Sequence, residues 1–157
     1  MKTLVLGLGN SILTDDGVGL RVAAEVEKRN DRPGVAVLRS ELGGLNLLDL
    51  LVGYDKAIII DAIYTKDGKP GQVYRLNEDS TEASHHANSA HGIDFKGMIE
   101  LGRRLGLDLP REFVIFAIEA EDTSSFGENL TPAVEESVAV CVESVVQELN
   151  HSAAVSA

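Results

Sequence analysis

The sequence has 157 residues, a length that fits one domain with a substantial hydrophobic core. Its formal net charge of −11 would repel phosphate backbones and anionic lipids, so we expect neither nucleic-acid nor membrane binding. Its one cysteine, Cys141, excludes an internal disulfide framework, a CxxC redox pair and a multi-cysteine zinc site. The first apolar run is too short for a signal peptide, and no run reaches the ~20 residues of a membrane span, so we expect a cytoplasmic protein.

Short apolar runs alternate with helical patterns along the chain. Runs typical of strands occur at Leu4–Leu6, Val35–Leu38, Ala57–Ile60, Gln72–Leu76 and Phe113–Ile118. Apolar residues at helical spacing predict helices over Gly17–Lys28, Leu45–Leu51, His91–Leu105 and from Pro132 onward. This alternation predicts an α/β sandwich with a mostly parallel sheet over residues 1–150, followed by a flexible tail over 151–157.

Acidic residues follow two of the predicted strands, where sites gather in sheets of this kind. Asp15 and Asp16 stand at the start of the first predicted helix. One of them can cap that helix, but adjacent residues point in different directions, so the other is free to point into a cleft. Asp61 follows the most apolar run in the chain, and a carboxylate buried there needs a partner or a metal.

Three histidines are candidates to join these acids, and their spacing alone does not choose among them. His85 and His86 lie in a polar segment, and His91 stands where that segment meets the next predicted helix. Two carboxylates and one imidazole would form a site with open positions that suits nickel, zinc or iron.

The glycines of the first motif give only weak support for a nucleotide-binding site. Ile12 occupies the position of the third glycine in a dinucleotide-binding loop, and the two acids at the helix start would repel a phosphate. We therefore keep nucleotide binding only as a minor alternative.

Three segments resemble the hydrogenase maturation proteases of the HybD/HycI type. They are LVLGLGNSILTDDGVG at 4–19, IIIDAI at 58–63 and SAH at 89–91. The resemblance implies a three-layer sandwich, phosphorylase/hydrolase-like, with a twisted five-stranded sheet flanked by helices. It also implies an aspartyl-type endopeptidase that removes the C-terminal extension of a [NiFe] hydrogenase large-subunit precursor after nickel insertion. The precursor carries the nickel, which is the recognition element, so we expect no tightly bound cofactor of the protease itself.

The family's metal-contacting residues match Asp16, Asp61 and His91, and the resemblance implies catalytic and metal-binding roles for all three. His86 is a rival to His91 if the polar segment is aligned differently. Many family members carry Glu at the position of Asp16, so the shorter side chain here would sit further from the metal.

Two other functions compete with this interpretation. A non-catalytic, nickel-dependent scaffold for hydrogenase assembly would use the same three ligands without cutting its partner. A peptidyl-tRNA hydrolase-like enzyme also begins with GLGN, but here Ser11-Ile12 replaces the Pro-Gly that follows in those enzymes, and no histidine precedes His85.

Overall fold

The computed structural model describes residues 1–43, 46–78, 88–89 and 95–156. In chain order its elements are β1 (Thr3–Leu8), the 3-10 helix η1 (Thr14–Gly17), α1 (Val18–Arg29), β2 (Val35–Ser40), α2 (Asn46–Leu51), β3 (Lys56–Tyr64), β4 (Val73–Asn77), β5 (Asn88–Ser89), α4 (Phe95–Arg104), β6 (Glu112–Glu119) and α5 (Pro132–Ser156). Each run that predicted a strand overlaps a strand, and only Gln72 of the fourth run falls outside one.

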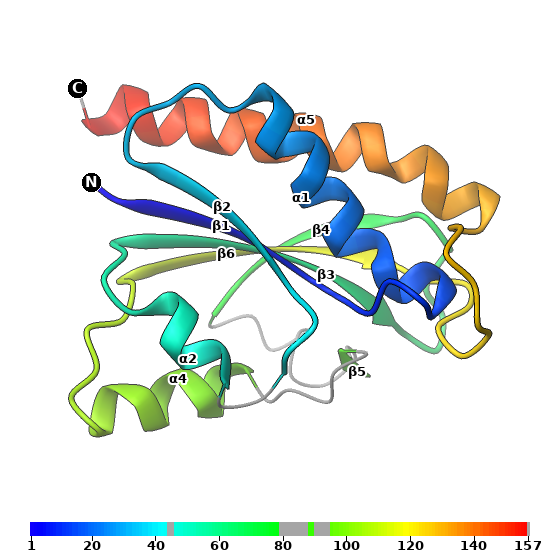
Figure 1. The fold of residues 1–157 in the computed structure, drawn as a ribbon, viewed down its shortest axis with the longest axis horizontal. Coiled ribbons are helices and arrows are strands. Elements are labelled where there is room, and N and C mark those ends of the chain that lie inside the picture. Colours follow the sequence, from blue (N-terminus) through cyan, green and yellow to red (C-terminus); the bar gives the residue numbers. More distant parts are fainter. Residues whose placement is uncertain (44–45, 79–87, 90–94, 157) are drawn as a thin grey trace.

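Five strands form the main path of one twisted sheet, in the order β2-β1-β3-β6-β4 (Figure 1). The first four are parallel to one another, and β4 runs antiparallel to β6 at the edge. The short strand β5 pairs antiparallel with the end of β3. The expected mostly parallel, five-stranded α/β sheet is confirmed.

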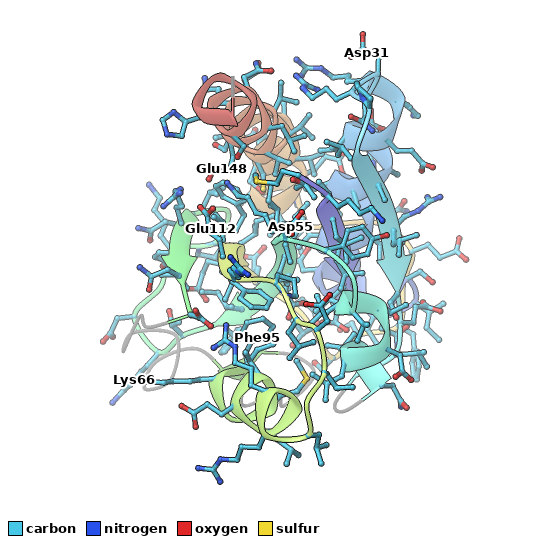
Figure 2. The ribbon with its side chains drawn as sticks, turned by 90° about the vertical axis from the view of Figure 1, so that its left-hand side faces the viewer. Asp31, Asp55, Lys66, Phe95, Glu112 and Glu148 are labelled. Atoms are coloured by element: carbon cyan, nitrogen blue, oxygen red, sulfur yellow. The ribbon has the colours of Figure 1, made fainter. Side chains whose placement is uncertain are left out.

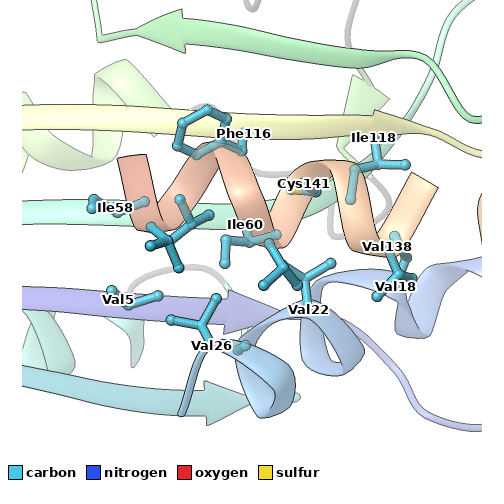
Figure 3. Close-up of a cluster of buried hydrophobic side chains, with 14 of the residues drawn as sticks. Val5, Val18, Val22, Val26, Ile58, Ile60, Phe116, Ile118, Val138 and Cys141 are labelled. Carbon is cyan, nitrogen blue, oxygen red and sulfur yellow. The ribbon is translucent and has the colours of Figure 1, made fainter. Parts of the chain in front are cut away.

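Helices cover both faces of the sheet, which gives three layers (Figure 1). Helices α1 and α5 lie side by side on one face, and α2 and α4 lie on the other. The core under α1 and α5 is built mainly from Val and Ile side chains, with Phe116 and Cys141 among them (Figure 3). The core under α2 and α4 is richer in Leu, and Phe95 packs edge-on against Phe113 there. The chain thus builds an almost wholly aliphatic interior.

Strand β3 is longer than the sequence predicted. The apolar run suggested an end at Ile60, but the strand continues to Tyr64. It continues because β6 runs beside it, pairing Asp61 with Ala117 and Ile63 with Glu119, after the pairing of β3 with β1 has ended at Gly7–Ile60. Asp61 is therefore inside a strand rather than after one.

A buried ion-pair network holds the end of α5 against the amino-terminal edge of the sheet, the edge that faces the viewer in Figure 2. The Lys56 side chain, 2% exposed, donates to Glu148 Oε1 at 2.8 Å and to Ser152 Oγ at 2.6 Å. Glu112 lies 3.3 Å from the same ammonium group, and Arg75 also binds Glu148. Helix α5 continues past this anchor to Ser156, and the flexibility of the tail over 151–157 stays a prediction.

Among the described residues, no helix combines the length and the apolar character needed to cross a membrane.

Candidate functional site

The carboxyl edge of the sheet, at the right of Figure 1, is built around two close backbone contacts. A Cβ on Gly9 would lie 2.2 Å from the carbonyl oxygen of Asp16. A Cβ on Gly19 would lie 2.3 Å from the carbonyl oxygen of Leu8 and 2.4 Å from that of Ile60. Only glycine fits at such distances, so the first turn of α1 rests directly on the ends of β1 and β3. The glycines of the opening motif thus serve close packing.

Asp16 lies at this edge, in η1, with 3% of its surface exposed. Its backbone N–H donates to Leu13 O at 3.0 Å, and its carbonyl oxygen accepts from Asn10 N at 3.2 Å. These two bonds fold the loop after β1 back on itself and bring η1 into contact with β3.

Asp61 reaches the same edge from β3 and is 6% exposed. It directly follows Ile60, the residue on which Gly19 rests, so the two acids belong to adjoining segments of backbone. Ile60 and Ala62 pack into the core under α1 and α5, so strand alternation directs Asp61 to the face of α2 and α4. One carboxylate oxygen of Asp61 accepts from the N–H of Ala62 at 2.8 Å.

Asp15 has a different task from its neighbour. It is fully buried, and its Oδ2 accepts from the backbone N–H groups of Glu121 and Asp122 at 2.9 and 3.0 Å. Its Oδ1 accepts from the N–H of Thr131 at 2.8 Å, and the Thr131 hydroxyl bonds both oxygens. The sequence left open which acid has a structural role. Asp15 has it, but at the turn before α5 rather than at the start of α1.

His91, with its rival His86 and with His85, lies outside the described residues. Within the part of the chain that the structure describes, no group of three or more His, Cys, Asp or Glu side chains is arranged to hold a metal ion. Asp16 and Asp61 are among the described residues, and the three-ligand set of Asp16, Asp61 and His91 stays a prediction.

Glu119 is a buried acid at this edge that the sequence analysis did not name. It ends β6 and is 1% exposed. Its carboxylate accepts from the N–H of Thr65 at 2.7 Å, from the Thr65 hydroxyl and from the Tyr74 hydroxyl at 3.1 Å. Burial, together with the bond to Glu119 and its charge, raises the pKa of Tyr74. An acid at the end of an apolar run was the same signal that singled out Asp61.

The loop between β6 and α5 borders a polar hollow of about 520 Å³, lined by Tyr64, Thr131 and residues 121–125. Asp122 organises that loop by accepting from the N–H groups of Ser124 and Ser125 at 3.0 and 2.9 Å. Hydrogen bonds from Ser125 and then Ser124 hold the pKa of Asp122 below its ordinary value. The edge therefore carries negative charge at neutral pH and suits a cationic ligand.

Two buried carboxylates at one sheet edge have clear chemical uses. Ionised, they are oxygen ligands for a divalent metal, and a single carboxylate can accept a proton from water as a general base. These uses fit hydrolysis, because hydrolysis needs a polarised carbonyl group and an activated water.

Comparisons with known proteins agree with this architecture. The sequence profile of the HycI family, described as hydrogenase maturation protease, matches residues 20–148. Hydrogenase 2 maturation protease of Escherichia coli (strain K12) is 30% identical over 154 residues, covering 97% of this chain and 93% of that protein. The hydrogenase expression/formation protein HupD of Bradyrhizobium diazoefficiens is also 30% identical, over 94% of this chain and 78% of its own length.

Solved structures are similar over nearly the whole fold. The hydrogenase maturating endopeptidase HybD from E. coli has a TM-score of 0.83 at 29% sequence identity, covering 97% of this chain and 94% of that one. The [NiFe] hydrogenase maturation protease HybD from Thermococcus kodakarensis has a TM-score of 0.72 at 27% identity, covering 95% and 99%.

Proposed function

Because this chain belongs to the hydrogenase maturation protease family and is an endopeptidase of that kind, we propose that it removes the C-terminal extension of a [NiFe] hydrogenase large-subunit precursor after nickel insertion. The observation that carries this proposal is the presence of two buried carboxylates, Asp16 and Asp61, on adjoining segments of the carboxyl edge. The acidic surface of the loop beside them suits a substrate that brings a cation.

Nickel in this proposal is cargo of the substrate. Cysteine thiolates of the precursor hold it from one side, and oxygens of Asp16 and Asp61 with the imidazole of His91 complete its coordination from the other. A precursor without nickel lacks this bridge and binds weakly. The protease thereby acts only on precursors whose metal centre is complete.

Hydrolysis follows from the position that this bridge gives to the peptide. The bound nickel holds the scissile bond at the carboxyl edge, so the reacting groups are oriented before reaction. A water adds to the scissile carbonyl carbon and gives its proton to a carboxylate acting as general base. The C–N bond then breaks, and the departing amine takes up that proton.

The proposal is tested by the intact mass of the precursor. The purified large-subunit precursor encoded in the same genome is incubated with this protein, once loaded with nickel and once without it. We expect a short C-terminal peptide to be lost only from the nickel-loaded form. Asp16→Asn, Asp61→Asn and His91→Ala should abolish this loss, while Asp31→Asn, the same change at an exposed position, should not alter it.

Other results would contradict parts of the proposal. Binding of a loaded precursor without cleavage would favour the assembly scaffold. Equal cleavage rates for the nickel-loaded and the nickel-free precursor would show that nickel has no part in substrate recognition. Normal cleavage by the Asp16→Asn or the Asp61→Asn variant would show that the replaced carboxylate is not part of the active site.

A further inference from the structure

Three loops at the carboxyl edge are tied into one surface. Ser11, in the loop after β1, donates its N–H and its hydroxyl to Glu41 Oε1, both at 2.9 Å, which fixes the loop after β2. The loop after β1 also pairs with the loop before α5 through a parallel bridge between Leu13 and Gly127. In that bridge the N–H of Gly127 donates to Ile12 O at 2.9 Å. These loops therefore present their side chains from a fixed backbone.

Three large apolar side chains on this surface point into solvent. Ile12 is 49% exposed, Leu42 56% and Phe126 85%. Ile12 and Phe126 directly precede the two bridged residues, Leu13 and Gly127, so they lie next to each other across the bridge.

The exposure of Phe126 is unusual in this chain. The sequence has four Phe residues, and the other three pack in the two cores. Its backbone is also held, because the Thr14 hydroxyl donates to Ser125 O at 2.6 Å and Asp122 caps the turn that precedes it. A fixed, exposed aromatic ring next to other apolar groups is typical of a surface that contacts another protein.

We infer that Ile12, Leu42 and Phe126, together called the apolar platform, dock the precursor subunit beside its cleavage point. This inference rests on the proposed function. The platform is continuous with the candidate site, because Ile12 and Asp16 belong to the same connection between β1 and α1. A precursor segment bound at Asp16 therefore contacts a residue that lies four residues along the chain from the platform residue Ile12.

Charge around the platform defines the segment that fits it. Glu41, Glu121 and Glu128 are exposed carboxylates on the same tied loops. Hydrogen bonds from the backbone and side chain of Ser11 hold the pKa of Glu41 below its ordinary value, so this carboxylate stays ionised. Apolar groups within an acidic rim are complementary to a segment with apolar side chains and Lys or Arg residues around them. The occupant is accordingly an apolar, basic segment of the precursor.

The test compares Phe126→Ser with Leu105→Ser. Leu105 is 67% exposed and follows α4, where the chain returns to the amino-terminal edge. With nickel-loaded precursor as substrate, we expect Phe126→Ser to raise KM about ten-fold, equivalent to about 1.4 kcal/mol. Its kcat should stay within about two-fold, because docking contacts are made equally in the ground state and the transition state. Leu105→Ser should leave both constants unchanged.

Each other outcome overturns the inference in a recognisable way. If the KM of Phe126→Ser is unchanged while the wild type cleaves normally, the docking role of the platform is wrong and the proposed function still stands. If the wild type does not cleave the precursor, the proposed function itself is contradicted. An equal rise in KM for Leu105→Ser shows a general effect of surface apolarity. A wild-type dimer in gel filtration that Phe126→Ser converts to monomer, at unchanged KM, assigns the platform to a second copy of the chain. Circular dichroism melting of each variant controls for folding.

Discussion

Replacing Asp15 with Asn should cost about 2–3 kcal/mol of folding free energy, although it removes no heavy atom. The carboxylate accepts from three backbone N–H groups, those of Glu121, Asp122 and Thr131, at 2.8–3.0 Å. An amide offers only one acceptor oxygen, so its NH2 group must face at least one of these donors. A hydrogen bond to a charged group contributes about 1.5–3 kcal/mol, and a buried donor left without an acceptor is similarly costly. Asp15→Ala, which removes both oxygens, should cost roughly 4 kcal/mol.

Urea unfolding followed by far-ultraviolet circular dichroism measures this loss. With a slope of about 2 kcal/mol per molar urea, the midpoint of Asp15→Asn should fall by about 1 M. Asp31→Asn makes the same chemical change at an exposed position and should leave the midpoint in place. A wild-type midpoint for Asp15→Asn, or an equal fall for Asp31→Asn, would refute the role of Asp15 as the tie between η1 and the turn before α5.

Three further predictions concern the interior. Glu148→Gln should cost about 3 kcal/mol in urea unfolding, because it leaves the buried ammonium of Lys56 without its closest carboxylate. Burial acts to raise the pKa of Glu148, but hydrogen bonds and charge from its basic partners outweigh it and lower that pKa. The gap in stability between wild type and Glu148→Gln should therefore be constant above about pH 5 and narrow as the pH falls through the lowered value. Gly19→Ala should cost about 3 kcal/mol by the same assay, because the added Cβ would meet Ile60 O at 2.4 Å. Burial raises the pKa of Cys141 to about 12, so a thiol reagent at neutral pH should label it only after unfolding.

The fold was largely predictable because its strands carry their signal locally. Continuous apolar runs identified the central strands, and the helix predicted from Pro132 onward begins at Pro132. What the sequence did not reveal depends on distant partners. The extension of β3 past Ile60 depends on its neighbour β6, and the anchoring of α5 at the sheet involves Lys56, whose bond to Ser152 spans 96 positions.

In the candidate site, too, the features with a local sequence signal were predictable and those that depend on distant residues were not. Position brought out Asp15, Asp16 and Asp61, since all three stand where parallel strands reach the carboxyl edge, and the family resemblance selected Asp16 over Asp15. The separate role of Asp15 was not visible, because its donors lie more than 100 positions away along the chain. Glu119 carries the same local signal as Asp61, but its structural role depends on Thr65 and Tyr74, which lie 54 and 45 positions away along the chain.

The bond between Asp15 and Thr131 joins residues 116 positions apart, and this separation has a consequence for synthesis in the cell. Asp15 leaves the ribosome early, but the N–H groups that hold it emerge only when the last quarter of the chain is being made. A nascent chain therefore completes this tie only after most of its length is translated, and a chain that ends before Thr131 lacks the donor that Asp15 Oδ1 binds. We therefore expect the proposed proteolytic activity only in chains that extend past Thr131.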